Sequence, residues 1–430
     1  MDELDREIQQ AKSANNRSLK KAVKLKQELL LIEARNARVK GGLQRAYAAK
    51  VPGGNLGVFC VSNSAYEKFS RKGITEHVNA SGIPELRSFC YSIAANAQFL
   101  EAKHFLQSSL SSLVNSVKSW VENSQGRSGA ASHQEREELL KAHNDLYTKV
   151  ATVISDIKIS AAETFEEQLL LLMANRNESW EQAAKAQSSR WTGWHWTQYN
   201  AWCINNGTHA TRGRPLTRWN AELIWKRRQE EDFAWSLIEE EIPEYFERLE
   251  KLFREEMLKM NTIANQHGDA PTFSQGIVLR IEALKYIFSL IQRDFLKEFT
   301  AIRRNASDDN YNSYILREML PSYRSASQEY GTGKMARQHE IIRRRIADGN
   351  LFPNISFCIQ NDMTALIDRI FKNVQKKVQG VLNLIRADLE RTFIPKATVE
   401  NGAMRELVSR VAYLEEELED MLKGIPLPSV

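Results

Sequence analysis

The sequence predicts a mainly α-helical fold: an elongated bundle of antiparallel helices with a small partial α/β region at the N-terminus. Two observations predict the bundle. Residues 85–123 and 130–192 contain neither Gly nor Pro, and their apolar residues recur at helical spacing. A third observation, the short apolar run Val58–Val61, predicts the α/β region.

The N-terminal region, residues 1–83, should combine helix with a single strand. Residues 2–49 have the apolar spacing of one or two helices. The run Val58–Val61 does not alternate with polar residues and is bounded by Pro52-Gly53-Gly54 and Ser62-Asn63. Such a run is typical of a strand buried on both faces. A lone buried strand leaves its backbone groups unpaired, so it implies a sheet that the rest of the chain does not visibly supply.

Three helical regions should follow. Residues 84–190 predict a long helical hairpin, an antiparallel pair of helices joined by a Gly- and Ser-rich linker. Residues 191–242 are rich in Trp and interrupted by Gly and Pro, which predicts a compact and irregular helical insert. Residues 243–430 contain further amphipathic stretches that complete the stalk-like bundle.

Two prolines and one apolar repeat give further predictions for residues 243–430. Pro243 is expected to open a helix and Pro321 to end one. The last helix has apolar residues spaced 4-3-4-3 over about two heptads, which is typical of a short coiled-coil seam. These residues are Leu407, Val411, Leu414, Leu418 and Met421.

Composition narrows the class of protein. Of the 430 residues 42% are hydrophobic, which is enough for a sizeable core. The 59 basic and 54 acidic residues give a net charge of +5 that is spread along the chain and does not require nucleic acid. Four separated Cys are typical of reduced thiols. The polar N-terminus and the absence of a long apolar run predict an intracellular protein, cytoplasmic or nuclear, without a signal peptide or transmembrane helix.

One stretch has the composition of a phosphate-binding loop, Gly331-Thr332-Gly333-Lys334. A true loop of this kind reads GxxxxGK[ST] and lies between a strand and a helix. Here Met335 follows the Lys, and no strand is predicted before the glycines. A turn that joins two helices is the favoured interpretation.

Each of the other candidate sites also has an ordinary structural interpretation. The Trp-rich region and its Arg residues fit a stacking platform for single-stranded nucleic acid, but the packing of a small core is the favoured interpretation. His195, Cys203 and His209 match no usual zinc spacing. The runs Lys226–Arg228 and Arg343–Arg345 fit nuclear-import or anionic-lipid patches, although runs this short are more often a solvated helix face.

Several segments become informative through their order along the chain. They are Leu43–Tyr47, Gly57–Tyr66, Ser81–Arg87, Trp191-Thr192, Tyr199–Gly207 with Trp219-Asn220, Met319–Tyr323 and Glu329–Lys334. Together they resemble the last strand and final helix of the GTPase domain, and then the helical region, of fungal dynamin-like large GTPases, which are similar to the nuclear dynamin-like GTPases of vertebrates. The resemblance covers nearly the whole chain.

The resemblance implies that the chain comprises the end of a GTPase domain and a complete helical stalk. Ser62 and Asn63 would then lie near the loop that contacts the guanine base. The sequence departs from the family in lacking the Walker A motif, the switch Thr, Asp-x-x-Gly and the base-reading Asn/Thr-Lys-x-Asp, which the family pattern places upstream of Met1. Nothing in this chain would then cradle phosphates or hold Mg²⁺. We therefore expect a truncated or degenerate GTPase that neither hydrolyses GTP nor carries a cofactor, although the family uses GTP and Mg²⁺.

Three functional hypotheses follow. In the first, the stalk mediates self-association and is coupled to a GTPase domain missing from this chain, so that the expected partners are further copies of the chain and a GTPase domain. In the second, the chain is a catalytically inert helical scaffold or adaptor. In the third, it binds nucleic acid through the Trp- and Arg-rich region. The sequence identifies no membrane partner.

Overall fold

The structure, a computed structural model, describes residues 2–47, 56–124, 133–266, 271–393 and 402–423. They form two compact units, one up to Lys103 and the other from His104 onward. Both are mainly α-helical, which confirms the predicted fold class, and the strands within these ranges are two that form one hairpin. In the same ranges no helix carries the sustained apolar stretch that a bilayer span requires.

The first unit is built from short and long helices. They are α1 (Asp2–Ser13), α2 (Arg17–Tyr47), α3 (Asn63–Ser70), α4 (Thr75–Ala80) and α5 (Ile83–His104). A small cluster of Leu4, Ile8 and Val23 joins α1 to α2. Phe69 of α3 packs on His77 of α4, whose Nε2 lies 3.0 Å from the carbonyl oxygen of Leu25 in α2.

The predicted strand at Val58–Val61 is wrong. Residues 56–62 form no strand and lie against helices instead: the ring of Phe59 is 4.8 Å from that of Phe89 in α5. Val61 is exposed, so burial on both faces is also wrong. The physical reason is that a strand needs a partner for its backbone groups. The described part of this unit offers no second strand, and the apolar side chains are only half-covered by α2 and α5.

A glycine allows this irregular segment to approach α5. Gly82 has φ +71°, and a Cβ built on it would lie 2.1 Å from the carbonyl oxygen of Cys60. The neighbouring Ser62 N–H donates to the carbonyl oxygen of Ser81 at 2.9 Å. Any side chain at position 82 would therefore push the segment away from the start of α5.

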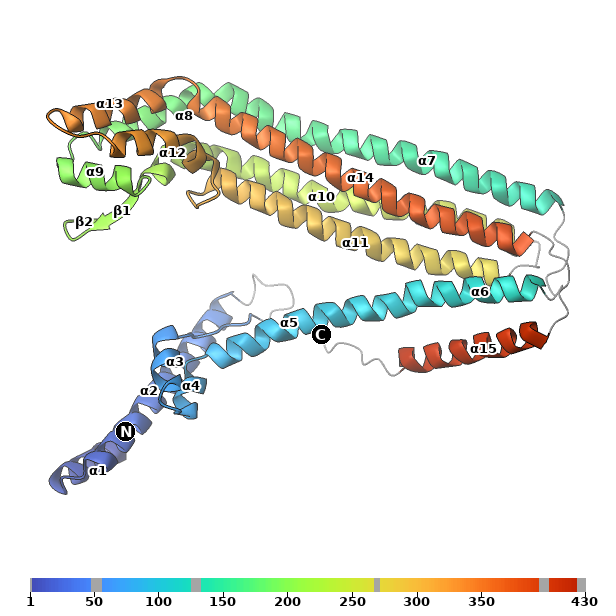
Figure 1. Ribbon diagram of the computed structural model, residues 1–430, viewed down its shortest axis with the longest axis horizontal. Helices are drawn as coiled ribbons and strands as arrows, with labels where there is room; N and C mark the ends of the chain where they lie inside the picture. Colours follow the sequence, from blue (N-terminus) through green and yellow to red (C-terminus); the bar gives the residue numbers. More distant parts are fainter. Residues whose placement is uncertain (1, 48–55, 125–132, 267–270, 394–401, 424–430) are drawn as a thin grey trace. The chain divides into compact units, whose positions relative to one another are not determined.

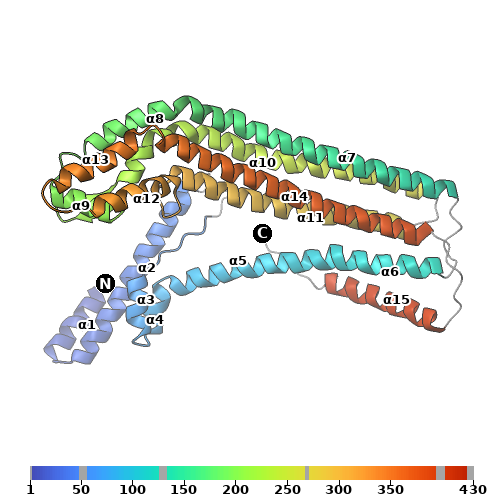
Figure 2. The same cartoon turned by 45° about the horizontal axis from the view of Figure 1, so that its top comes forward.

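The second unit contains the long helices. Their bounds are η3 (Phe105–Leu110), α6 (Ser111–Ser124), α7 (His133–Phe165), η4 (Glu166–Leu170), α8 (Leu171–Ser189), α10 (Trp219–Gln266), α11 (Pro271–Ser307), α14 (Leu351–Phe393) and α15 (Gly402–Lys423). At about 1.5 Å per residue, the 48-residue α10 is about 70 Å long. Within this unit α7 and α8, α10, α11 and α14 run side by side in alternating directions (Figures 1 and 2), as in an up-down four-helix bundle.

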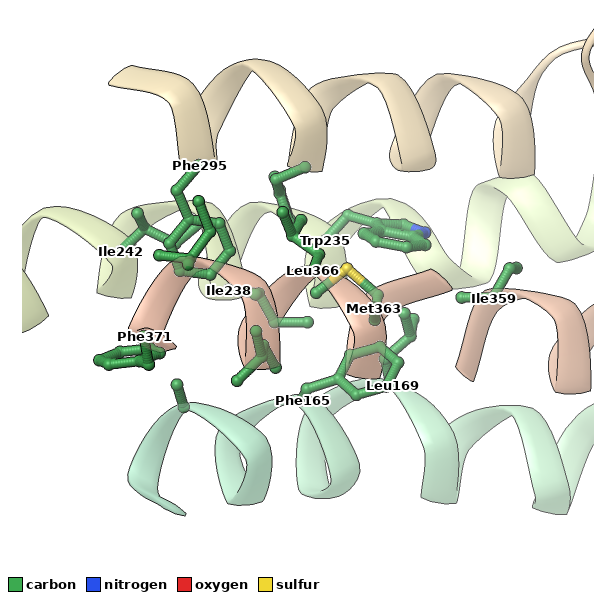
Figure 3. Packing of buried hydrophobic residues seen from close by; sticks show 14 of the residues in the cluster. Phe165, Leu169, Trp235, Ile238, Ile242, Phe295, Ile359, Met363, Leu366 and Phe371 are labelled. Atoms are coloured by element: carbon green, nitrogen blue, oxygen red, sulfur yellow. The ribbon is translucent and has the colours of Figure 1, made fainter. Parts of the chain in front are cut away.

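The bundle core is continuous along these helices. Figure 3 shows Phe165 and Leu169 from one side meeting Met363 and Leu366 of α14, with Trp235 of α10 above them. All of these side chains are almost fully buried. Burial of large apolar side chains at about 25 cal/mol per Å² is the main favourable term for such a bundle.

A compact head caps one end of the bundle. It consists of α9 (Trp196–Ile204), β1 (Thr208–Thr211), β2 (Arg214–Arg218), α12 (Tyr314–Ser327) and α13 (Lys334–Ala347). The sequence predicted an irregular helical insert here and missed the antiparallel hairpin, in which Thr208 pairs with Arg218. Its strands contain Arg, His and Pro rather than an apolar run, so their composition gave no strand signal.

Two predicted helix boundaries and one predicted helix pair are also wrong. Pro243 lies inside α10 and Pro321 inside α12, where neither opens nor ends a helix. A proline removes one backbone hydrogen bond, and packing along the rest of each helix offsets that loss. In addition, α6 packs on α11, α14 and α15, whereas α7 packs on α14 and α10, so residues 84–190 do not form one hairpin.

Candidate functional site

The candidate site is a groove in the second unit. It has a volume of about 820 Å³ and lies between η3 and α6 on one side and α11 and α15 on the other. Most of the side chains that line it are hydroxyls, amides or charged groups, with Val114, Leu279, Leu418 and Leu422 as apolar members. A cavity of this size and chemistry can hold a small polar molecule.

One end of the groove carries a stacked histidine. The ring centroids of His104 and Tyr286 are 3.6 Å apart and their planes differ by 13°. Burial lowers the pKa of His104, an effect that the backbone and carboxylate of Glu282 partly oppose. The ring is therefore neutral near pH 7, and its role here is to close the end of the groove.

The nearby hydroxyl of Ser108 does not form a nucleophile with His104. The Ser108 Oγ lies 3.0 Å from Nδ1 of His104 but also donates to the carbonyl oxygen of His104 at 2.7 Å. Ser108 is only 2% exposed. Although Ser108 lines the groove, its hydroxyl proton is engaged by the carbonyl oxygen of its own helix rather than by His104, so this pair is structural.

Next to the groove, and sharing Asn115 with it, a buried polar network attaches α6 to the bundle. Asn115 Nδ2 donates to the carbonyl oxygen of Thr272 at 2.8 Å. Ser116 Oγ donates to Oδ1 of Asp388 at 2.8 Å, and Arg280 Nη2 pairs with Oδ2 of Asp388 at 2.9 Å. All five residues are largely buried, so these contacts link α6, α11 and α14 with little exposure to water.

The network belongs to a polar face of α6 that points at the bundle. Its buried members, spaced at helical intervals, are Ser112, Asn115, Ser116 and Ser119. A helix on the surface of a bundle normally directs its apolar stripe inward. Helix α6 therefore directs a face of hydroxyl and amide groups at the bundle, although its Val114 and Val121 are buried as well.

On its other side α6 contacts α15. Lys118 Nζ lies 2.9 Å from Oε1 of Glu415, and Val411 and Leu418 of α15 are buried in the same contact. Both are positions of the predicted heptad seam. The other seam positions are half-buried or exposed, so α15 uses only one side of the seam within this chain.

The buried ion pair should decide how firmly α6 is held. Replacing Arg280 by Met removes one buried partner of the Asp388 carboxylate, which keeps Ser116 Oγ and, at 3.4 Å, Arg391 Nη1. The loss should therefore stay below the about 3–5 kcal/mol of a buried pair that is broken outright. We expect faster hydrogen exchange across residues 111–121, while the core of α14 remains protected. Lys118→Met is the matched control, because its ion pair is partly exposed and should be worth about 1 kcal/mol or less. Equal protection of α6 in both variants would contradict the assignment.

The remaining sequence candidates lie away from this groove. Ser62 is the N-cap of α3 and accepts a hydrogen bond from the N–H of Ala65 at 3.3 Å, and Asn63 is the first residue of that helix. Their role near a guanine base stays a prediction that follows from the resemblance. The structure gives Ser62 a local capping role.

The glycine loop at 331–334 is a turn between α12 and α13, which was the favoured interpretation of its sequence. Gly331 and Gly333 have φ +77° and +80°, and Gly333 is the N-cap of α13. Arg337 donates to the carbonyl oxygens of Thr332 and Tyr330 at 2.9 and 2.6 Å. The loop is thus fastened to its own helix by carbonyl groups, which would repel a phosphate.

The Trp-rich region is a core, as the favoured interpretation held. Trp191 and Trp219 stack with centroids 4.4 Å apart, and Trp194 meets Trp202 edge to face. Buried rings of this kind cannot stack on bases without local unfolding. Two other tryptophans of the region, Trp196 and Trp225, are exposed.

The three residues considered as metal ligands serve other purposes. His195 caps α9, and its Nδ1 lies 2.8 Å from Oγ1 of Thr197. Cys203 is buried, which raises the pKa of its thiol to about 12 and disfavours the thiolate that binds metals. His209 packs against the edge of Trp202. Within the described ranges no group of three or more potential ligands comes together.

The two basic runs are not uniform patches. In Lys226–Arg228 the middle residue, Arg227, is buried and paired with Glu231, so a wholly solvated face is wrong here. In Arg343–Arg345 the first residue pairs with Glu340 and the last with Glu318 and Asp348. Sequence spacing alone did not predict either burial or pairing.

The polar face of α6 was missed as well, although the sequence Ser112–Ser119 carries a readable signal. Ser or Asn recurs there at intervals of three and four residues. That pattern predicts one polar helix face. What it lacks is any sign that this face is the buried one, because Asp388 and Arg280 are remote in sequence.

The fold and this site define a mainly α-helical bundle protein with a separately docked pair of helices. A family model described as a domain of unknown function, DUF7605, matches residues 175–352, which is under half of the chain and runs from α8 to the start of α14. The matched span contains the head and its Trp core. No curated protein and no solved structure matches the chain.

Proposed function

We propose that the chain is a stalk-like assembly module, of the kind that the resemblance to dynamin-like GTPases implies. It self-associates through helical surfaces and is coupled to a GTPase domain that its own sequence does not encode. The chain holds no GxxxxGK[ST] motif, so we further propose that it binds no GTP and hydrolyses none by itself.

The observation that carries this proposal is the distribution of uncovered apolar side chains. The 31-residue α2 has Val23 as its buried residue, although it contains many Leu, Ile and Val residues. Phe89, Ile93 and Leu100 of α5 are exposed too. By contrast, the apolar stripes of α10, α11 and α14 are covered by one another. Uncovered apolar helix faces of this kind are typical of surfaces that bind other proteins.

Self-association should be measurable on the intact chain. We expect the mass found by sedimentation equilibrium to rise above the monomer value of 49.3 kDa between about 1 and about 100 µM protein. Because apolar contacts carry the association, added salt should not weaken it.

A mass that stays at 49.3 kDa over that range would contradict self-association. It would instead favour the alternative, a helical adaptor whose uncovered faces bind other proteins only. The nucleic-acid hypothesis has less support, because most of the tryptophans on which it depends are buried in the head core.

A further inference from the structure

The side of α6 that faces away from the bundle is apolar. Leu113 and Val117 of α6, with Leu110 at the end of η3, lie on average about 140° around the helix from the buried Ser and Asn face, at about 100° per residue. Leu113 is 60% exposed, and the other two are half-buried. Helix α6 therefore directs hydroxyl and amide groups toward the bundle, and its opposite side is apolar, with Val114 and Val121 buried and Leu113 exposed.

Helix α15 extends this apolar strip. It lies beside α6 and runs in the opposite direction in both views (Figures 1 and 2), and the Lys118–Glu415 ion pair joins the two helices. The heptad positions Val411 and Leu418 pack on α6, whereas Leu414 and Met421 are 49% and 47% exposed. One side of the seam is thus filled and the other is open.

We infer that the open strip of α6 and α15 binds the same strip of a second copy of the chain, an inference that rests on the proposed function. Two antiparallel helices with one shared apolar face are half of an up-down four-helix bundle. A twofold axis supplies the other half from an identical surface, as in isologous dimers. The filled seam positions continue directly into the new contact, so the dimer contact would extend an interface that already exists within the chain.

Charge specifies how the four helices alternate. Helix α15 contains six acidic and three basic residues, whereas α6 contains one of each. Two neighbouring α15 helices would repel each other, so each α15 lies between the α6 of its own chain and the α6 of the second copy. In that order Leu414 and Met421 meet the Leu113 side of the other copy.

Charged substitutions on the strip test the surface. Leu113→Glu and Leu414→Glu should each weaken self-association by about thirtyfold or more, the effect of losing a central apolar contact. Leu258→Glu on α10 and Leu384→Glu on α14 are matched controls, because both leucines are similarly exposed outside the strip. The controls should associate like the wild type. Circular dichroism melting should show that all four variants fold, because each change is at an exposed position.

Cross-linking tests the arrangement without depending on a destabilising change. Chains carrying Leu113→Cys are mixed with chains carrying Leu414→Cys, both on a Cys90→Ser background because Cys90 is an exposed thiol. A disulfide-linked heterodimer should form under mild oxidation faster than with Leu258→Cys as the second chain. Self-association that survives both Glu variants without this heterodimer would overturn the assigned surface and leave the proposed function standing. A monomeric wild-type chain would overturn both.

Discussion

Replacing Arg227 by Met should lower the free energy of unfolding of the bundle by about 3–5 kcal/mol. Arg227 and Glu231 are each 1% exposed, with Nε of the arginine 2.7 Å from Oε1 of the glutamate. Trp235 Nε1 also donates to this carboxylate at 3.3 Å, and the guanidinium lies over the ring of Trp180. The substitution leaves the buried carboxylate of Glu231 among aromatic rings without its arginine. Urea unfolding followed by tryptophan fluorescence measures the loss.

The double variant Arg227→Met with Glu231→Leu is the control. Removing both charges should recover most of the lost stability, since apolar pairs often replace buried ion pairs without cost. A double variant as unstable as the single one would show that packing, rather than charge, is responsible.

The same pair predicts a pH dependence. Burial raises the pKa of Glu231, and Arg227 opposes that rise. A carboxyl group whose pKa is raised on folding contributes stability below its ordinary pKa near 4.5, and that contribution is lost as the pH rises through the folded-state pKa. Without Arg227 the rise is larger. The deficit of the single variant should therefore be greatest near pH 7 and shrink as the pH approaches 4.5.

Gly207→Ala should cost about 2–5 kcal/mol, the sum of backbone strain and overpacking. Gly207 has φ +83°, and a Cβ there would lie 2.6 Å from Oη and 2.9 Å from Cζ of Tyr323. Tyr323 is fully buried and donates to Oδ1 of Asn220 at 2.9 Å. The ring has no room to retreat because Trp219 packs beside it.

Gly331→Ala separates the two contributions. Gly331 has a nearly equal φ of +77°, but a Cβ there meets nothing within 4 Å. The Gly331→Ala substitution should lower the free energy of unfolding only by the backbone strain, about 1 kcal/mol. Thermal unfolding of the two variants side by side gives the difference, and equal melting temperatures would refute the clash with Tyr323.

The helical bundle was predictable because the pattern that indicates each helix lies within a short stretch of sequence. Helical spacing of apolar residues identified the stretches that become α7, α11 and α14, since one face of each had to be covered. The tryptophans of the head were also predicted as core from their size alone. Those features depend on the composition and spacing of neighbouring residues, which the sequence states directly.

The features that the sequence did not predict, or predicted wrongly, depend on contacts between residues that are remote in sequence. The run Val58–Val61 has strand composition, yet strand formation requires a second strand that the described part of its unit does not provide. The polar stripe at Ser112–Ser119 was readable, but its burial depends on Asp388 and Arg280. The short hairpin at Thr208–Arg218 is held by Trp202, whose Nε1 donates to the carbonyl oxygen of Thr217. None of these contacts has a period or spacing that predicts it.

The order of α6 and α15 along the chain has a consequence for synthesis. Their ion pair joins Lys118 to Glu415, residues 297 positions apart, with the whole four-helix bundle between them. A growing chain displays the apolar side of α6 long before α15 leaves the ribosome, since domains are made from the N-terminus at about 5–20 residues per second. For that interval of about 15–60 s the side of α6 that later packs on α15 is not covered by that helix. If copies of the chain associate through α6 as proposed, a neighbouring nascent chain would reach it first and assembly would begin during translation.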